Sequence, residues 1–272
     1  MLVCALGDLL LDVVVRLEGQ LVPGGDVGAR TVISPGGQAA NVAAWASSLG
    51  VHARLVTKRA EDEAGRLAAT RVGELGVDVA GPIVAAGATG VVVSLVAADG
   101  ERTMASDRGV SETFAPAELD AAWLAGCDHL FVSGYCLTSE QGRRLAEVAI
   151  ASARSEGARV SIDLSATSAI ESCGVAVLRA FIAHVRPDAV FCNDDEDRAA
   201  GGAVDGTHWI LKRGARGVSF DGDEREAVDT ASVDSTGAGD ALAAGWIVGG
   251  PLLGLETAAR CVAQVGAMPR AS

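Results

Sequence analysis

A glycine-rich segment near the carboxyl end of the chain has the residues that phosphoryl transfer needs. Residues 233–240 read Val-Asp-Ser-Thr-Gly-Ala-Gly-Asp, and an apolar run with helical spacing, 241–246, follows at once. Glycines on either side of Ala238 allow successive backbone N–H groups to turn toward one point, and the start of the helix adds the positive end of its dipole. We predict that Gly237, Ala238 and Gly239 form an anion hole for a phosphoryl group.

Asp240 lies at the mouth of this predicted anion hole. A carboxylate there would repel a phosphate, so it needs a function, and the obvious one is to accept a proton from an attacking hydroxyl group. The alternative is structural, because Asp240 could merely cap a helix that follows a strand-to-helix turn. Taken alone, the segment leaves both interpretations open.

A second glycine pair lies near the amino end of the chain. Residues 35–43 read Pro-Gly-Gly-Gln-Ala-Ala-Asn-Val-Ala, with Gly36 and Gly37 before an alanine-rich helix and Asn41 one turn inside it. Together the two segments resemble both signatures of the ribokinase-like (PfkB-type) carbohydrate kinases, an early Gly-Gly-x-x-x-Asn-x-Ala and a late Asp-Ser/Thr-x-Gly-Ala-Gly-Asp. They occur in the expected order, and the resemblance covers nearly the whole chain.

The resemblance implies roles for residues near the early signature. In the family, an aspartate after the first strand binds sugar hydroxyls together with the asparagine and the backbone of this signature, which are here Asp12, Asn41, Gly36 and Gly37. A short carboxylate can accept hydrogen bonds from two neighbouring hydroxyls, which apolar contacts cannot distinguish. Asp8 competes with Asp12 for this role, but its position near a turn makes us expect a structural function for it.

The resemblance also indicates where ATP and Mg²⁺ bind. Asn193 and Glu196 fit the family's Asn-x-x-Glu motif, which implies that Asn193 contacts phosphate and that Glu196 holds Mg²⁺ partly through water. A helix N-cap followed by an acidic first turn is the structural alternative. Gly214 and Gly217 match the segment over which the family's nucleotide lies. Lys212 replaces a small hydroxyl residue, and it either reaches a phosphate or is a solvated surface charge.

Three further residues have open roles. In potassium-activated members, positions similar to Asp234 and Thr236 hold a monovalent cation, so a K⁺ site is conceivable here, with its other half in residues 265–272. That segment and the one between Glu196 and Trp209 are short for the family. Arg108 either contacts a carboxylate or phosphate of the acceptor or braces the β-rich region around it.

Composition and charge narrow the choice of partners. The 272-residue chain has a formal net charge of −13, with 49% hydrophobic and 4% aromatic residues. This charge argues against nucleic acid or an anionic membrane surface as the main partner. The six cysteines lack a C-x-x-C pair and are best explained as buried reduced thiols. No apolar stretch is long enough to span a membrane, so we expect a cytoplasmic protein.

Short apolar runs alternate with alanine- and leucine-rich segments of helical spacing. This alternation predicts an α/β fold with a doubly wound, mainly parallel sheet, helices on both faces, and ligands at the carboxyl ends of the strands. The predicted strands are 2–6, 53–56, 129–132, 159–162, 189–191 and 209–211, and the predicted helices are 41–49, 64–75 and 139–156.

Two regions, 12–34 and 89–103, have β-type runs with a turn and no helix between them. We expect a small antiparallel sheet with turns at 23–25 and 99–100, although a β-meander packed on the main sheet is the alternative. In the family these positions resemble the lid over the sugar site, which often forms the dimer surface. We therefore expect a single kinase domain, residues 1–272, with an inserted β-lid and a homodimer formed through the lids.

These observations favour an ATP-dependent kinase that phosphorylates a hydroxyl group, typically a hydroxymethyl, of a small sugar or sugar-like substrate. A nucleoside kinase of the adenosine type is the nearest alternative, and the low aromatic content argues against it because nucleobases prefer stacking surfaces. A non-catalytic sugar- or nucleotide-binding regulator with the same fold is a third possibility. The presence of Asp240 counts against that regulator.

Overall fold

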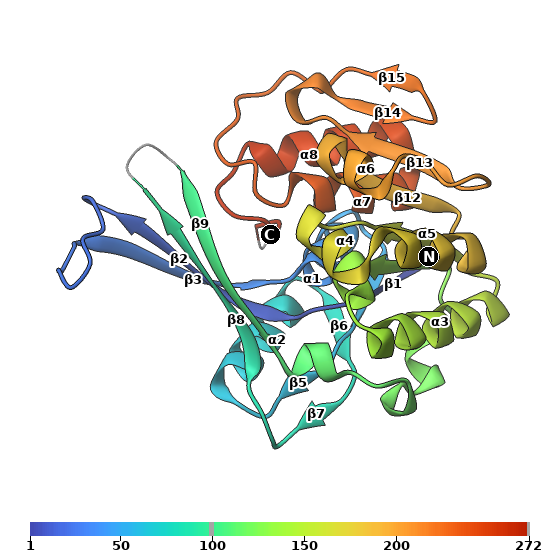
Figure 1. Ribbon diagram of the computed structural model, residues 1–272, viewed down its shortest axis with the longest axis horizontal. Helices are drawn as coiled ribbons and strands as arrows, with labels where there is room; N and C mark the ends of the chain where they lie inside the picture. Colours follow the sequence, from blue (N-terminus) through green and yellow to red (C-terminus); the bar gives the residue numbers. More distant parts are fainter. Residues whose placement is uncertain (98–100, 271–272) are drawn as a thin grey trace.

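The computed structural model describes residues 1–97 and 101–270, and its largest element is a nine-stranded sheet (Figure 1). The strand order is β15-β14-β13-β12-β11-β10-β1-β4-β6, parallel from β13 to β6 and antiparallel at the β14–β15 end. The strands are β1 (Leu2–Leu6), β4 (His52–Val56), β6 (Val77–Ala80), β10 (His129–Ser133), β11 (Arg159–Asp163), β12 (Ala189–Asn193), β13 (His208–Lys212), β14 (Val218–Phe220) and β15 (Asp223–Arg225).

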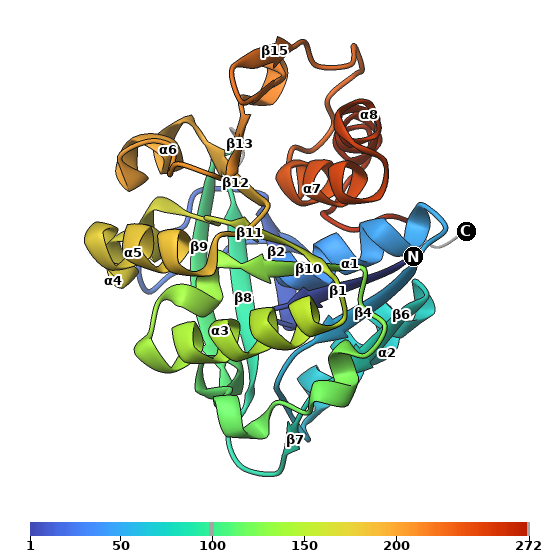
Figure 2. The ribbon, with the colours of Figure 1, turned by 90° about the vertical axis from the view of Figure 1, so that its right-hand side faces the viewer.

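Helices cover both faces of this sheet (Figure 2). One layer holds α3, α4, α5 and α6, and the other holds α1, α2, α7 and α8. Side chains of each central strand alternate between the two apolar cores, because successive residues of a strand point to opposite faces. The helices are α1 (Gln38–Ser48), α2 (Glu63–Glu74), α3 (Glu140–Ser155), α4 (Thr167–Cys173), α5 (Val175–Val185), α6 (Asp194–Ala200), α7 (Ala238–Gly249) and α8 (Pro251–Val262).

The predicted α/β architecture is confirmed, including all six strands and three helices named from the sequence. Several strands extend one or two residues beyond the apolar runs. The added final residues include Asp163, Asn193 and Lys212, which lie at the carboxyl edge of the sheet. Polar residues at these strand ends therefore belong to the sheet and face the place where a parallel α/β fold binds ligands.

A separate four-stranded sheet, the lid, projects from the main body (Figure 1). Its order is β3-β2-β8-β9, with β2 (Leu10–Leu17), β3 (Ala29–Gly36), β8 (Thr89–Val96) and β9 (Arg102–Gly109). The expected separate sheet is confirmed, but the expectation of a wholly antiparallel one is wrong. The two hairpins are antiparallel internally, whereas β2 and β8 pair in parallel because both leave the main body in the same direction.

The turn expected near Gly24 is present, whereas the one expected at 99–100 lies outside the described residues. A two-stranded sheet, β5 (Arg59–Ala60) with β7 (Ile83–Val84), completes the β-structure described.

The six cysteines are free thiols, as expected. Within residues 1–97 and 101–270, no single helix has the length and apolarity to cross a membrane, and the one pair that reaches them together, α4 with α5, is bent by 89°.

Candidate active site

The two glycine-rich segments meet at the carboxyl edge of the main sheet. Gly36 ends β3 and Gly37 leads into α1, while Gly237 leads into α7. Nδ2 of Asn41, in α1, donates a 2.8 Å hydrogen bond to Oδ2 of Asp240, in α7. Residues that are 199 positions apart in the sequence therefore form one site.

The backbone before α7 contains the predicted anion hole. Gly237 has a φ of 78°, and a methyl group on it would lie 2.6 Å from Cβ of Ala267, so only glycine fits there. The N–H of Ala238 donates to the carbonyl of Ser235 over 3.3 Å. The N–H groups of Gly239 and Asp240 belong to the first helical turn, which has no intrahelical acceptor for them, whereas the N–H of Ala241 donates to the carbonyl of Gly237 over 2.9 Å.

Asp240 is partly buried at the start of α7. Its surroundings raise the pKa of its carboxyl group from 3.8 to about 7, mainly through burial and then through the charge of Asp163. Hydrogen bonds from Asn41 and Gln38, together with the charge of Lys212, lower this pKa in part. A carboxyl group that titrates near neutral pH is well matched to the removal of a proton from a hydroxyl.

Lys212 is a cation of this site. Its side chain is 14% exposed, and its Nζ lies 2.6 Å from Oδ2 of Asp163, which is fully buried at the end of β11. Burial acts to lower the pKa of Lys212, but the carboxylates of Asp163 and Glu196 raise it above its ordinary value. The ammonium group is therefore charged, and the interpretation of Lys212 as a solvated surface charge is wrong.

Asp12 lies against the first glycine pair. A methyl group on Gly36 would lie 2.2 Å from Oδ2 of Asp12, so glycine is what allows the carboxylate to approach the backbone. Burial raises the pKa of Asp12 to about 6. Because Gly36 and Gly37 continue directly into α1, which carries Asn41, the four predicted sugar-binding residues share one part of the molecule.

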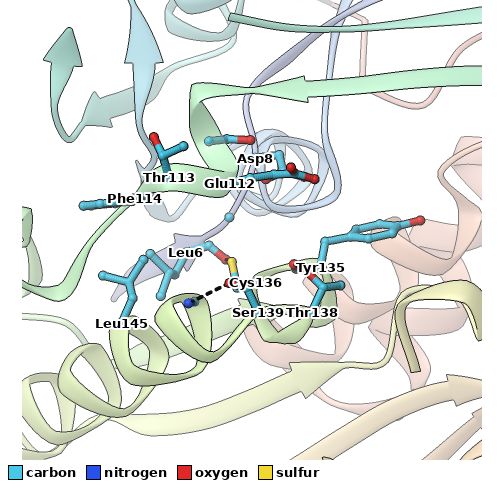
Figure 3. Close-up of a pocket in the computed structure, with 13 residues that line it drawn as sticks. Leu6, Asp8, Glu112, Thr113, Phe114, Tyr135, Cys136, Thr138, Ser139 and Leu145 are labelled. Atoms are coloured by element: carbon cyan, nitrogen blue, oxygen red, sulfur yellow. Dashed lines mark hydrogen bonds between the residues drawn. The ribbon is translucent and has the colours of Figure 1, made fainter. Parts of the chain in front are cut away.

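Arg108 bridges the lid and the main body. Its guanidinium forms an ion pair with Asp8 and lies 3.5 Å from the ring centroid of Tyr135. These contacts agree with a structural function for Asp8 and with a bracing function for Arg108. Figure 3 shows that Asp8 and Tyr135 border a cavity of about 300 Å³, together with Glu112 from the segment after β9.

Asn193 and Glu196 are bonded to each other. The backbone N–H of Asn193 donates to Oε2 of Glu196 over 2.9 Å, and Nδ2 of Asn193 donates to Oε1 over 2.7 Å. In return, Oδ1 of Asn193 accepts from the N–H groups of Asp195 and Glu196. This capping box begins α6. Both residues thus perform the structural task that the sequence offered as the alternative.

Glu196 nevertheless lies in the electrostatic field of the site. Its carboxylate is buried, and burial raises its pKa while the charge of Lys212 lowers it. Among residues 1–97 and 101–270, no three His, Cys, Asp or Glu side chains converge on a metal position. The single buried carboxylate of Glu196 fits Mg²⁺, which keeps its waters and binds through one or two carboxylates together with substrate phosphates.

A pocket of about 500 Å³ lies beside the predicted anion hole. It is lined by Lys212, Gly214 and Gly217 on one side and by Ala238 and Gly239 on the other. The structure therefore brings the predicted nucleotide-binding segment to the predicted anion hole. Apolar residues of α7 and α8 and the segment 227–235, which includes polar side chains, line the rest of this pocket. Apolar walls with a few polar groups suit a small organic ligand.

Asp234 and Thr236 are close to each other in the loop before α7. Oδ1 of Asp234 accepts hydrogen bonds from the N–H of Thr236 over 3.0 Å and from its hydroxyl over 2.7 Å. Oδ2 of Asp234 accepts from the N–H of Gly266 over 3.2 Å. These bonds connect the loop to the segment after α8, the region that was expected to supply the other half of a cation site.

Sequence reasoning missed Gln38, which stands inside the early signature. Its Oε1 accepts hydrogen bonds of 2.6 Å from the hydroxyls of Ser133 and Ser165. Both hydroxyls donate, so the oxygen of the amide is fixed toward them and its NH₂ group is directed to Asp240. The one available signal was its position, three residues before Asn41, on the first turn of the same helix.

The chain is similar to known carbohydrate kinases over nearly its whole length. The family model for pfkB family carbohydrate kinases matches residues 1–269. An ATP-dependent ribose-1-phosphate kinase of Halopiger xanaduensis is 32% identical over 259 residues, which cover 90% of this chain and 83% of that protein.

Solved structures of low sequence identity share the fold. An adenosine kinase from Sinorhizobium meliloti has a TM-score of 0.85 and 21% identity, with 98% of this chain and 95% of that one covered. A putative ribokinase II from E. coli, in complex with ATP and Mg²⁺, has a TM-score of 0.80 and 22% identity, with 99% and 95% covered. From the match of the family model over almost its whole length, this chain belongs to the pfkB family of carbohydrate kinases.

Proposed function

We propose that this ATP-dependent kinase transfers the γ-phosphoryl group of ATP to a hydroxymethyl group of a small sugar or sugar phosphate. The hydrogen bond between Asn41 and Asp240 carries the proposal, because it joins the predicted sugar-binding residue to the predicted base. Each of these residues comes from one of the two signatures. Their contact means that an acceptor bound at the early signature has its hydroxyl beside a carboxylate.

In this proposal Asp240 removes the proton from the acceptor hydroxyl as that oxygen attacks phosphorus. The N–H groups of Gly237 and Gly239 stabilise the negative charge on the transferring group, together with that of Ala238, which would exchange its 3.3 Å bond to the carbonyl of Ser235 for one to the phosphoryl oxygen. Asn41 supports the ionised form of Asp240, since a hydrogen bond to the charged form favours it. Mg²⁺ supplies positive charge to the phosphates when bound, and Glu196 would hold it, with Asn193 beside the phosphates.

The acceptor is proposed to bind Asp12, Asn41 and the backbone of Gly36 and Gly37. The relative from Halopiger adds sugar phosphates to the acceptors to be considered, since its name gives ribose-1-phosphate as substrate. Arg108 is the guanidinium at this end of the site that would bind such an anionic substituent. Its ion pair with Asp8 and its stacking on Tyr135 hold it in place for that task.

A panel of acceptors tests this function. ATP consumption is measured with ribose-1-phosphate, ribose, other pentoses and hexoses, sugar acids and adenosine. We expect the highest kcat/KM for a pentose or pentose phosphate. A clear preference for adenosine would replace the proposal with a nucleoside kinase, and tight sugar binding without turnover would replace it with a regulator.

We also propose that residues 1–272 act as one kinase domain in the cytoplasm, with the β-lid inserted at about 12–34 and 89–103, and that two lids pair in a homodimer.

Asp234 and Thr236 are proposed to hold a monovalent cation such as K⁺, which would reinforce the bonds that stiffen the loop before α7. If kinase activity is measured in choline chloride instead of potassium chloride, kcat should then be lower. Equal rates in both salts would show that the hydrogen bonds are sufficient.

A further inference from the structure

We propose that Lys212 binds the γ-phosphoryl group of ATP and that Asp163 holds its ammonium group between the nucleotide pocket and the anion hole. The proposal rests on the kinase function given above and adds a residue that binds the transferring group itself. Lys212 is the last residue of β13, and Asp163 is the last residue of β11. Because β12 lies between these strands, their side chains meet across its carboxyl end.

The position of Nζ points to the γ-phosphoryl group. Lys212 lines the pocket of about 500 Å³ with Gly214 and Gly217. At its other end the side chain reaches the anion hole, since a methyl group on Gly239 would lie 3.2 Å from Nζ. A phosphoryl group that passes from this pocket to a hydroxyl beside Asp240 must cross this point, so the ammonium lies along its path.

Charge balance gives a reason for a cation here. Asp163, Glu196 and Asp240 all act on Lys212 through their charges. Without the ammonium group, the negative charge of these carboxylates would be uncompensated and would repel an incoming triphosphate. Lys58 and Lys212 are the only lysines in the sequence, and Lys58 is paired with Glu118, so Lys212 is the lysine that supplies this positive charge.

The neighbouring arginines are engaged elsewhere. Arg213 pairs with Glu224 and Asp194, and Arg216 pairs with Asp194. Lys212 is thus the basic side chain of this segment that is directed toward the anion hole.

A purely structural function is the competing explanation, in which Lys212 only neutralises the buried Asp163. Removal of one partner from a buried pair leaves an unpaired charge and destabilises the fold, so Lys212→Met alone could not separate the two explanations. The double variant Asp163→Asn/Lys212→Met removes both charges together. It keeps a neutral, similarly shaped pair and should keep a melting temperature close to that of the wild type.

The decisive measurement is nucleotide binding without acceptor. Dissociation constants for ATP and for ADP, each with Mg²⁺, are determined by calorimetry for the wild type and the double variant. We expect ATP affinity to fall at least about tenfold in the double variant, the loss of one charge-assisted hydrogen bond, while ADP affinity stays within about twofold. The matched control is Lys58→Met/Glu118→Gln, which removes the other lysine–carboxylate pair and should leave the ratio of the two affinities unchanged.

Two results would overturn the proposal. An unchanged ratio of ATP to ADP affinity in the double variant would reduce Lys212 to a counter-ion of Asp163. An equal loss for both nucleotides would place the ammonium at the β-phosphate or further back. Failure of the wild type to bind ATP would instead contradict the kinase function itself, so the two failures are distinguishable.

Discussion

The pKa of Asp240, the proposed base, depends on its neighbours. Burial and the charge of Asp163 favour its protonated form, whereas Asn41, Lys212 and Gln38 favour the ionised form. The balance gives a pKa of about 7, at which a carboxylate is a stronger base than it is in water but still partly ionised. A small change among these neighbours therefore changes the ionised fraction of Asp240 at neutral pH.

The variant Asp240→Asn tests the base directly. It should lower kcat by about 10²–10⁴, the usual loss for a general base. Its melting temperature at pH 8 should not fall, because the wild type must there keep a partly buried carboxylate ionised. Near-normal turnover in this variant would remove Asp240 from the mechanism.

The pH dependence of kcat/KM follows from the raised pKa of Asp240. The base must be deprotonated, so activity is present above about pH 7 and falls about tenfold per unit of pH below it. Asn41→Leu removes a hydrogen bond that favours the ionised carboxylate, so the acidic midpoint should move to higher pH. A profile that is flat between pH 6 and pH 8 in the wild type would contradict this assignment.

Asp12 provides a test of acceptor recognition. Asp12→Ala should raise the KM for the sugar by at least about tenfold, because a site built to bind hydroxyls loses its acceptor, and should leave the KM for ATP almost unchanged. Steady-state kinetics with each substrate varied in turn separates the two. If the effect fell on ATP instead, the sugar and nucleotide ends of the site would be assigned in reverse.

The sequence was sufficient for residues whose spacing along the chain defines their chemistry. Asn41 and Asp240 belong to recognisable motifs, and the structure brings them into contact. Gln38 and Lys212 could not be assigned in this way, because their partners are set by tertiary structure. Lys212 contacts Asp163 only because β11 and β13 lie on either side of β12. The order of strands in a sheet cannot be predicted from a short stretch of sequence.

Among the elements, α6 combines a structural and an electrostatic task. Its N-terminus is closed by the capping box between Asn193 and Glu196, and its first turn contains four acidic residues, 194–197. Acidic side chains stabilise this end of a helix through its dipole. The same short helix begins where β12 ends, beside Lys212, so its cap also lies at the edge of the site.

Two variants separate these tasks. Asn193→Ala removes the cap and should destabilise the protein by about 0.5–2 kcal/mol, measured by denaturant unfolding. Glu196→Gln keeps an oxygen for the backbone N–H of Asn193 but loses the charge and the bond from Nδ2 of Asn193, so we expect a destabilisation of about 1 kcal/mol and a several-fold higher Mg²⁺ requirement for activity. An unchanged Mg²⁺ requirement would leave Glu196 with the cap alone.

The lid shows why it is harder to predict which strands pair with each other than to predict where strands occur in the sequence. Three of its strands, β2, β3 and β8, contain β-type runs that were evident from the sequence, whereas β9 contains none and extends beyond residue 103, where the lid was expected to end. The parallel pairing of β2 with β8 was not predicted, since it joins segments separated by α1 and α2. The parallel pairing of β2 with β8 is determined by where the two hairpins are attached to the main body.

On the scale of the whole molecule, the doubly wound sheet could be predicted because its buried strands are short apolar runs between helical segments. The lid differs, because one of its faces lacks a full cover. Val13 and Val15 on β2 lie beside Val93 and Leu95 on β8 in register, and all four are only partly buried. Exposed apolar residues on a sheet indicate a partner surface.

A two-fold pair of lids would cover this face, and we predict a homodimer at micromolar concentration in sedimentation experiments. Val93→Lys places a charge in the centre of the face and should give monomers with a raised KM for the acceptor, because an unsupported lid would close poorly over it. Val148→Lys, on the exposed side of α3, is the matched control and should stay dimeric. A wild-type monomer with full kinase activity would show instead that each lid works alone.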